Sequence, residues 1–179
     1  MRARWAQIGV LVIAVAGLAW AAFVVMGRDS NVSPSALIGR PAPQVTLDRF
    51  DGSGPTALAE PGVVNVVNFW APWCVPCRAE HRDLGALRSG WDVTQVRLIG
   101  VSFQSDLAAI GTFLDEVGQG VPTVTDGDGI AAIEFGVVGV PETFVIDRAG
   151  IVRRRFVGPV DTSELQKVID ELLLEGPAT

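Results

Sequence analysis

Short runs of apolar residues alternate with amphipathic stretches along most of the chain. Runs rich in valine, isoleucine and phenylalanine, bounded by glycine or proline, predict strands at residues 44–47, 62–70, 93–103, 121–125, 143–146 and 151–157. Apolar positions three or four residues apart predict helices at residues 75–88, 107–117, 130–135 and 161–174. This order of strands and helices, with a hairpin and a helix at the end, predicts an α/β fold. We expect a central mixed sheet that is covered by helices on both faces.

The N-terminus departs from this pattern because it carries one long apolar segment. Residues 5–27, between Arg4 and Arg28, hold no formal charge and are long enough to cross a bilayer core of roughly 30 Å as a helix. Arg2 and Arg4 precede the segment, which predicts a cytoplasmic N-terminus and an external remainder. The alternative is a cleaved signal peptide, with residues 19–21 as the cleavage site, but its apolar region is typically only about 7–15 residues long. We therefore expect an uncleaved single-pass anchor, and either alternative exports the remaining chain.

These patterns divide the chain into four parts. They are a cytoplasmic stub with the transmembrane signal-anchor at residues 1–28, a polar linker at 29–38, a globular domain at 39–175 and a tail at 176–179. Three of the 14 lysines and arginines lie in the first part, so 11 remain against all 20 acidic residues, and the exported part has a net charge near −9. Such a surface does not suit nucleic acid or anionic lipid headgroups. We expect no nucleic acid among the partners.

Few residues in the chain can carry redox or metal chemistry. Cys74 and Cys77 are the two cysteines, and His81 is the one histidine. A structural zinc site normally needs four such ligands, so we expect no metal. A structural disulfide is another alternative, but closing so short a loop removes little entropy from the unfolded chain. A redox-active C-x-x-C pair, with no cofactor besides its own disulfide, is the better interpretation.

The position of the pair, between the predicted strand at 62–70 and the predicted helix at 75–88, gives it a specific reactivity. Cys74 would lie at the helix N-terminus, where unpaired backbone amides and the helix dipole stabilise a thiolate. The thiolate is the nucleophile in disulfide exchange, so Cys74 is the expected attacking residue. Pro76 suits the first turn because it lacks an N–H. Cys77, about one turn further, could then break a mixed disulfide formed on Cys74.

Two blocks of the sequence together resemble a known family. Residues 68–77 read NFWAPWCVPC and continue as RAEH, and residues 135–147 read FGVVGVPETFVID. These blocks resemble the thioredoxin superfamily, in particular its membrane-anchored cytochrome c maturation members, the CcmG/DsbE and TlpA/ResA group. The resemblance covers about residues 38–174. It implies a thioredoxin fold with an extra N-terminal hairpin within residues 41–60 and a central insert within residues 118–135.

The resemblance also implies roles for individual residues. Pro141 would be a cis-proline opposite the cysteines, and Val140 would offer its backbone to an extended substrate. Glu80 and Glu142 would belong to the active site, where a carboxylate near a buried thiol can take up its proton. The predicted catalytic residues are therefore Cys74, Cys77, Glu80, Pro141 and Glu142, and the predicted substrate-binding residues are Trp73, Pro76 and Val140.

Three further residues near the pair have different expected roles. Thioredoxin has a buried aspartate just before its Phe-Trp pair, whereas this chain has Asn68, which cannot titrate. Any acid that serves the cysteines must then come from elsewhere, and Glu80 is the nearest candidate by sequence. Trp70 is expected to be an apolar wall of the site. For His81 we favour a structural or surface role over a catalytic one.

The resemblance, the anchor and the acidic residues predict a reductant on the outer, periplasmic side of the cytoplasmic membrane. It would take electrons from a membrane thiol–disulfide carrier and reduce the haem-attachment cysteines of apocytochrome c, or a haem-delivery protein. Alternatives are a reductant for another exported target, such as a copper-centre assembly protein, a general disulfide oxidoreductase, and a binding module with a structural disulfide. An oxidant would need a strongly stabilised thiolate, which nearby negative charge disfavours. A peroxidase would need an isolated cysteine in a different motif, which the sequence lacks.

Overall fold

The computed structural model of the protein describes residues 15, 17, 20 and 36–175. Among these residues no helix is both long and apolar enough to cross a membrane. Apart from residues 15, 17 and 20, the predicted signal-anchor at residues 1–28 lies outside the described residues, as do most of the predicted linker and the predicted tail. The boundaries of these parts therefore stay predictions.

A five-stranded mixed sheet organises the second of the chain's two units, residues 31–179. In spatial order its strands are β5 (Thr123–Asp126), β4 (Val96–Phe103), β3 (Val64–Trp70), β6 (Glu142–Ile146) and β7 (Val152–Val157). The first three run parallel to one another, β6 is antiparallel to β3, and β7 is antiparallel to β6. β3 is buried at every position, as expected of a valine-rich strand that is covered on both faces. The predicted mixed α/β sheet is confirmed.

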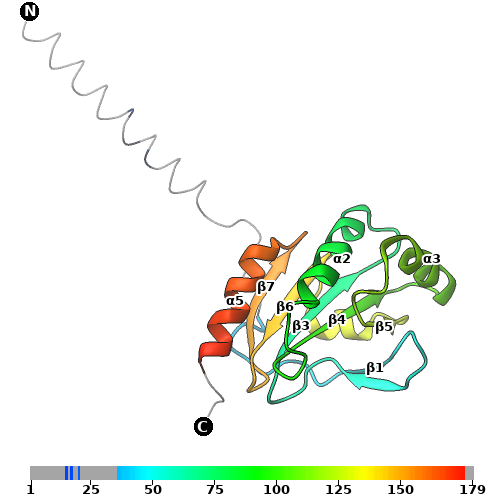
Figure 1. Ribbon diagram of the computed structural model, residues 1–179, viewed down its shortest axis with the longest axis horizontal. Coiled ribbons are helices and arrows are strands. Elements are labelled where there is room, and N and C mark those ends of the chain that lie inside the picture. The colour runs from blue at the N-terminus through cyan, green and yellow to red at the C-terminus, as the bar shows by residue number, and fades with distance from the viewer. Residues whose placement is uncertain (1–14, 16, 18–19, 21–35, 176–179) are drawn as a thin grey trace, which may run out of the picture. The chain divides into compact units, whose positions relative to one another are not determined.

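Helices cover both faces of this sheet, as predicted (Figure 1). They are α2 (Val75–Arg88), α3 (Leu107–Val117), α4 (Ile130–Phe135) and α5 (Thr162–Leu174). α2, α3 and α5 pack against the face that carries Val66 and Trp70 of β3, whereas α4 packs against the face that carries Val67 and Phe69. This division follows from the alternation of side chains along a strand.

A small two-stranded hairpin precedes the sheet. Its strands, β1 (Thr46–Asp48) and β2 (Pro55–Ala57), pair antiparallel within residues 41–60, where the resemblance implies a hairpin. Leu58, just after β2, is fully buried in the apolar cluster on the α4 face. The hairpin therefore adds to the cover of this face, together with the expected insert at residues 118–135, which contains β5 and α4.

Several strands begin one to three residues later than the sequence pattern predicts, and for β4 and β5 the structure shows a local reason. The pattern predicts β4 from residue 93, but it begins at Val96, because the Asp92 carboxylate accepts the backbone N–H and the hydroxyl of Thr94, at 2.9 and 2.7 Å, and so forms a turn. The pattern predicts β5 from residue 121, but it begins at Thr123, after Pro122, which has no N–H to offer a neighbouring strand. The strands themselves are confirmed.

One close backbone approach holds α2 against the loop that leads to β5. A Cβ atom added to Gly120 would lie 2.9 Å from the Cα of Gly85 in α2, and one added to Gly85 would lie 3.2 Å from the Cα of Gly120. Both neighbours are backbone atoms, which cannot rotate aside as a side chain can. The position of α2, the helix that begins at the cysteine pair, therefore depends on two residues without side chains.

We expect Gly120→Ala to lower the free energy of unfolding by roughly 1–3 kcal/mol, because the added methyl group must push two backbone segments apart. Urea unfolding followed by circular dichroism measures the change. Gly127→Ala is the control, because a Cβ atom there meets nothing within 4 Å and its stability should stay near that of the wild type. Equal stability of the two variants would contradict the close contact.

Candidate active site

The two cysteines lie where β3 leads into α2, and they form a disulfide bond. Cys74 is the N-cap of α2: its backbone is extended, and its Sγ accepts a hydrogen bond of 3.3 Å from the N–H of Cys77. Pro76 lies in the first turn, which contains no acidic residue. The helix N-terminus is thus directed at the sulfur of Cys74, as the sequence predicts, and its amides and dipole favour a thiolate there.

Exposure hardly distinguishes the two cysteines. Cys74 is 4% exposed and Cys77 is 1% exposed, so both are buried in the disulfide form. Position at the helix N-terminus, rather than exposure, therefore distinguishes the attacking thiol from the resolving one. Trp73 is 65% exposed and Pro76 is also exposed, which makes both accessible to a substrate.

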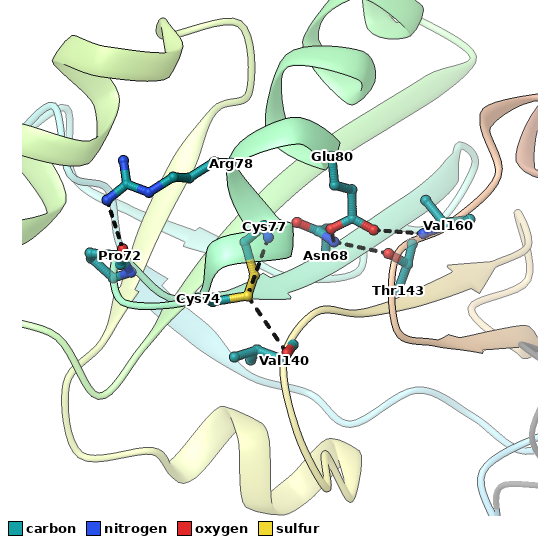
Figure 2. The surroundings of a disulfide bond; sticks show 9 residues. All are labelled: Asn68, Pro72, Cys74, Cys77, Arg78, Glu80, Val140, Thr143 and Val160. Atoms are coloured by element: carbon teal, nitrogen blue, oxygen red, sulfur yellow. Dashed lines mark hydrogen bonds between the residues drawn. A yellow bond between two sulfur atoms is a disulfide. The ribbon is translucent and has the colours of Figure 1, made fainter.

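The Val140–Pro141 peptide bond is cis, as the resemblance implies. The carbonyl oxygen of Val140 lies 3.6 Å from the Sγ of Cys74 (Figure 2). Val140 is half-buried and Pro141 is buried. The fold thus brings the loop before β6 to the cysteines, although 66 positions separate Val140 from Cys74 in the sequence.

Glu80 lies one turn after Cys77 on α2 and is only 4% exposed. Its carboxylate accepts hydrogen bonds from the Nδ2 of Asn68 at 3.0 Å and from the backbone N–H of Val160 at 2.8 Å (Figure 2). Burial raises the pKa of this carboxyl group from 4.5 to about 7; the two hydrogen bonds oppose the shift, and the nearby charge of Asp83 adds to it. Glu80 can therefore gain or lose a proton near neutral pH, which is the property that its expected role requires.

Asn68 connects the sheet to this acid. Its Nδ2 donates one hydrogen bond to Glu80 and another, of 2.9 Å, to the hydroxyl oxygen of Thr143 on β6. Asn68 and Thr143 are directly opposite each other in the β3–β6 pairing. The residue that stands in place of thioredoxin's buried aspartate therefore binds an acid from α2 instead of supplying one.

Glu142 follows the cis-proline directly, but its side chain points to the opposite face of the sheet. Side chains alternate along β6, and the next residue, Thr143, faces Asn68 and Glu80. Glu142 is fully buried on the α4 side. The structure therefore does not bring Glu142 to the cysteines, contrary to its expected part in proton transfer.

Three hydrogen bonds and an ion pair hold the Glu142 carboxylate instead. Oε1 accepts the backbone N–H groups of Val138 and Gly139, at 2.9 and 3.1 Å. Oε2 accepts the Nε–H of Arg155 at 2.9 Å and lies 2.8 Å from its Nη2. Arg155 belongs to β7 and is 7% exposed. This buried ion pair ties β7 to the loop that carries Val140.

An aromatic layer lies behind the disulfide. Trp70 is 1% exposed and stacks on Phe113 of α3, with ring centroids 4.3 Å apart. His81 contacts both rings edge-on and is 2% exposed. Burial lowers the pKa of His81 from 6.5 to about 4, and the Gly118 backbone opposes this shift. His81 is therefore a neutral packing residue at pH 7, and Trp70 is an apolar wall of the site.

A cavity of about 420 Å³ opens next to Trp73. Its lining includes Arg78, Gln104, Asp106 and Phe113. The guanidinium of Arg78 lies 5.3 Å from the centroid of the Phe113 ring. The part of the chain that the structure describes contains no group of three acidic, cysteine or histidine residues that could hold a metal ion.

Sequence reasoning missed three residues of this arrangement. Val160 contributes only its backbone N–H, for which a sequence carries no signal. Thr143 lies within the second sequence block, but its contact with Asn68 depends on strand register. Arg155 carries no clear signal, because it is one of three consecutive arginines on its strand. A run of arginines on a strand is more typical of a solvent-exposed edge.

Comparison with known proteins agrees with the fold and with the cysteine pair. The family model described as Redoxin matches residues 37–172. The thiol:disulfide interchange protein HelX of Rhodobacter capsulatus is 36% identical over 154 residues, which cover 84% of this chain and 85% of HelX. The thiol:disulfide interchange protein DsbE of Escherichia coli K12 is 35% identical over 150 residues, which cover 82% of this chain and 79% of DsbE. A crystal structure of a candidate thiol:disulfide interchange protein DsbE from Chlorobium tepidum is similar with a TM-score of 0.71 and 28% identity, over 78% of this chain and 99% of that chain.

The shifted pKa values of Glu80 and His81 predict opposite pH dependences of stability. Glu80 has a higher pKa in the folded protein than in the unfolded chain, so its contribution is full below pH 4.5 and is lost as the pH rises to about 7. His81 has a lower pKa when folded, so its contribution is present above pH 6.5 and is lost as the pH falls to about 4. The two effects offset each other in the wild type, and single substitutions should separate them.

Between pH 4.5 and about pH 7 the oxidised wild type should lose about 3 kcal/mol of unfolding free energy relative to Glu80→Gln, because only the wild type must bury a charge. The comparison with His81→Leu should show the opposite trend. The unfolding free energy of the wild type should fall relative to that variant as the pH falls from 6.5 to about 4, because only the wild type must then bury a charged imidazole. Urea unfolding at constant ionic strength across this range measures both differences. Parallel curves for the wild type and Glu80→Gln would contradict the raised pKa.

Proposed function

Because the chain belongs to the Redoxin family and is a DsbE-like thiol–disulfide oxidoreductase of the thioredoxin superfamily, we propose that it reduces disulfides on the outer face of the cytoplasmic membrane. The proposed substrate is the pair of haem-attachment cysteines of apocytochrome c, or a haem-delivery protein. One observation carries the proposal: the Cys74–Cys77 disulfide lies at a helix N-terminus, next to the Val140 carbonyl, with the buried Glu80 on the same helix. The resemblance to cytochrome c maturation thioredoxins supports the substrate class.

Reduction of a substrate disulfide begins at Cys74. Its thiolate, stabilised by the N-terminus of α2, attacks one sulfur atom of the substrate disulfide. A mixed disulfide forms on Cys74, and the other substrate sulfur leaves as a thiolate that takes up a proton. The backbone at Val140, whose carbonyl lies 3.6 Å from the Sγ of Cys74, would pair with an extended substrate. Trp73 and Pro76 are exposed beside Cys74 and would contact residues that flank the substrate sulfur.

Cys77 completes the exchange. Its thiol loses a proton and attacks the Sγ of Cys74, which restores the protein disulfide and releases the second substrate thiolate. Glu80 is one turn from Cys77 and has a pKa of about 7, so it can accept this proton and return it towards the departing thiolate. Two protein thiols are thereby oxidised to one disulfide, while one substrate disulfide is reduced to two thiols.

A membrane thiol–disulfide carrier would then reduce the protein again by the same exchange in the opposite direction. The buried acid favours a reductant over an oxidant. A strongly oxidising pair needs a strongly stabilised thiolate, whereas a carboxylate close to the pair, once ionised, disfavours a second negative charge beside it. We therefore propose that electrons pass from the carrier through Cys77 and Cys74 to the substrate.

We also propose that residues 1–28 anchor the protein in the cytoplasmic membrane, with the domain on the periplasmic side. The uncharged segment at residues 5–27 and the two arginines that precede it support this arrangement. An anchor would keep the active site close to the membrane carrier and to substrates that emerge from the membrane.

Cys77→Ser should trap the natural substrate. This change removes the resolving thiol and leaves the attacking sulfur at the helix N-terminus, so the mixed disulfide on Cys74 should persist. Purification of the trapped complex from membranes under non-reducing conditions, followed by mass spectrometry, identifies the partner. We expect an apocytochrome c, or a haem-delivery protein, and separately the membrane carrier.

Cys74→Ser is the matched control for this experiment and should trap little, because it leaves only the sulfur further inside the helix. Equal trapping by both variants would show that the assigned roles of the two cysteines are wrong. Capture of a copper-centre assembly protein, or of many unrelated exported proteins, would contradict the cytochrome assignment but leave the exchange chemistry intact.

The full chain should fractionate with membranes and resist extraction at alkaline pH, because a spanning helix is held by the bilayer core. A chain that begins at Asn31, exported with a cleavable signal, should be recovered from the periplasm without detergent. N-terminal sequencing of the full-length product is the decisive measurement. A mature form that begins near Ala22 would contradict the anchor.

A further inference from the structure

The loop of residues 136–141, which we call the Pro141 loop, runs from α4 to β6 and presents Val140 to Cys74. The position of this loop determines where the Val140 carbonyl oxygen lies, which is 3.6 Å from the Sγ of Cys74. Two backbone N–H groups in the middle of the loop donate to Oε1 of Glu142, at 2.9 and 3.1 Å. The conformation of the loop therefore depends on where the Glu142 carboxylate is held.

Arg155 holds that carboxylate and the start of the loop at the same time. Its Nε and Nη2 lie 2.9 and 2.8 Å from Oε2 of Glu142. Its Nη2 also donates to the carbonyl oxygen of Gly136 at 3.3 Å, and its guanidinium lies 5.8 Å from the centroid of the Phe144 ring. The side chains of Arg155 and Glu142 are 8% and 0% exposed. A single buried guanidinium thus bridges the two ends of the Pro141 loop.

We propose that Arg155 is a positioning residue for thiol–disulfide exchange. Acting through Glu142, it keeps the Pro141 loop where the Val140 backbone can receive an extended substrate beside Cys74. This inference rests on the proposed exchange reaction but not on the identity of the substrate. The contribution is large enough to detect, since misplacing a group by about 1 Å can cost up to about 100-fold in rate.

A purely structural role explains the pair less well. A buried ion pair is often no more stabilising than apolar residues of similar volume, because both charges lose their hydration. The aromatic ring of Phe144 beside Arg155 belongs to an apolar cluster that an apolar side chain would extend. The groups that need a guanidinium at this place are the Glu142 carboxylate and the Gly136 carbonyl, and both hold the Pro141 loop.

Two probes with the same leaving group separate peptide docking from chemistry at sulfur. One is 2-hydroxyethyl disulfide, and the other is a short peptide whose single cysteine is linked to 2-mercaptoethanol. Each reaction oxidises the two protein thiols to a disulfide and reduces the probe disulfide to two thiols. Only the peptide has a backbone that can pair with Val140. Single-turnover oxidation of the reduced protein, followed by tryptophan fluorescence, gives a second-order rate constant for each probe.

Arg155→Met should lower the rate constant for the peptide roughly tenfold or more and keep that for 2-hydroxyethyl disulfide within about twofold of the wild type, because the loop is displaced. Arg155→Lys should recover part of the loss, since an ammonium group can still bind Glu142. Arg153→Met is the matched control, because Arg153 lies on the same strand but pairs with Asp147 and Glu175 near the surface. Both of its rate constants should match the wild type.

Glu142→Gln tests whether Arg155 acts through the carboxylate. A glutamine amide oxygen still accepts the two N–H groups of the loop but lacks the charge that Arg155 binds. The double variant Glu142→Gln/Arg155→Met should therefore react with the peptide within about twofold of Glu142→Gln alone, because only the hydrogen bond to the Gly136 carbonyl is lost in addition. This comparison holds even if Arg155→Met by itself leaves Glu142 unpaired and prevents folding.

Equal losses with both probes, or no loss with the peptide, would overturn the assignment of Arg155. A further loss of about tenfold in the double variant relative to Glu142→Gln would overturn it too, because the arginine would then act mainly independently of the carboxylate. Failure of the wild type to reduce either probe would contradict the exchange activity itself and the inference with it. A trapped substrate other than apocytochrome c, together with the expected probe selectivity, would support Arg155 and refute only the proposed substrate.

Discussion

The register of β3 against β6 is the constraint on which the active site depends. The two strands pair antiparallel with Asn68 opposite Thr143. This places the start of β6, and the loop before it, at the end of β3 where α2 begins. The Val140 carbonyl consequently lies 3.6 Å from the Sγ of Cys74. A shift by one residue would turn Thr143 away from Asn68 and would exchange the faces of all side chains along the strand.

Two of the buried carboxylates, Glu80 and Glu142, show how the faces of the sheet create different environments. Glu142 lies on the α4 face, where two N–H groups of the Pro141 loop and the guanidinium of Arg155 bind it. Glu80 lies on the other face and receives only neutral donors, from Asn68 and Val160. Burial therefore prevails at Glu80 and raises its pKa to about 7. The ion-paired acid is suited to hold a loop, and the acid without a cation is suited to hold a proton.

The first turns of α2 meet two opposite requirements of disulfide exchange. The attacking sulfur must be stabilised as a thiolate, and at Cys74 the helix N-terminus and the N–H of Cys77 supply this stabilisation. The resolving thiol must give up its proton inside the protein, and Glu80 lies one turn further along the same helix. Because the helix dipole acts within the first turn and the acid lies beyond it, the two influences are separated along one element.

Local residue patterns were enough to predict the order and type of the five strands of the sheet and of α2, α3, α4 and α5, and to place Cys74 at a helix N-terminus. Such features depend on residues within one or two turns of each other, so the chain carries them in short segments. The second strand of the small hairpin, β2, came only from the family resemblance. The cis bond at Pro141 and the acid at Glu80 came from family resemblance. The face to which Glu142 points and its partner Arg155 could not be predicted from either source. They depend on strand register and on burial, which join residues far apart in the chain and exist only once the sheet has formed.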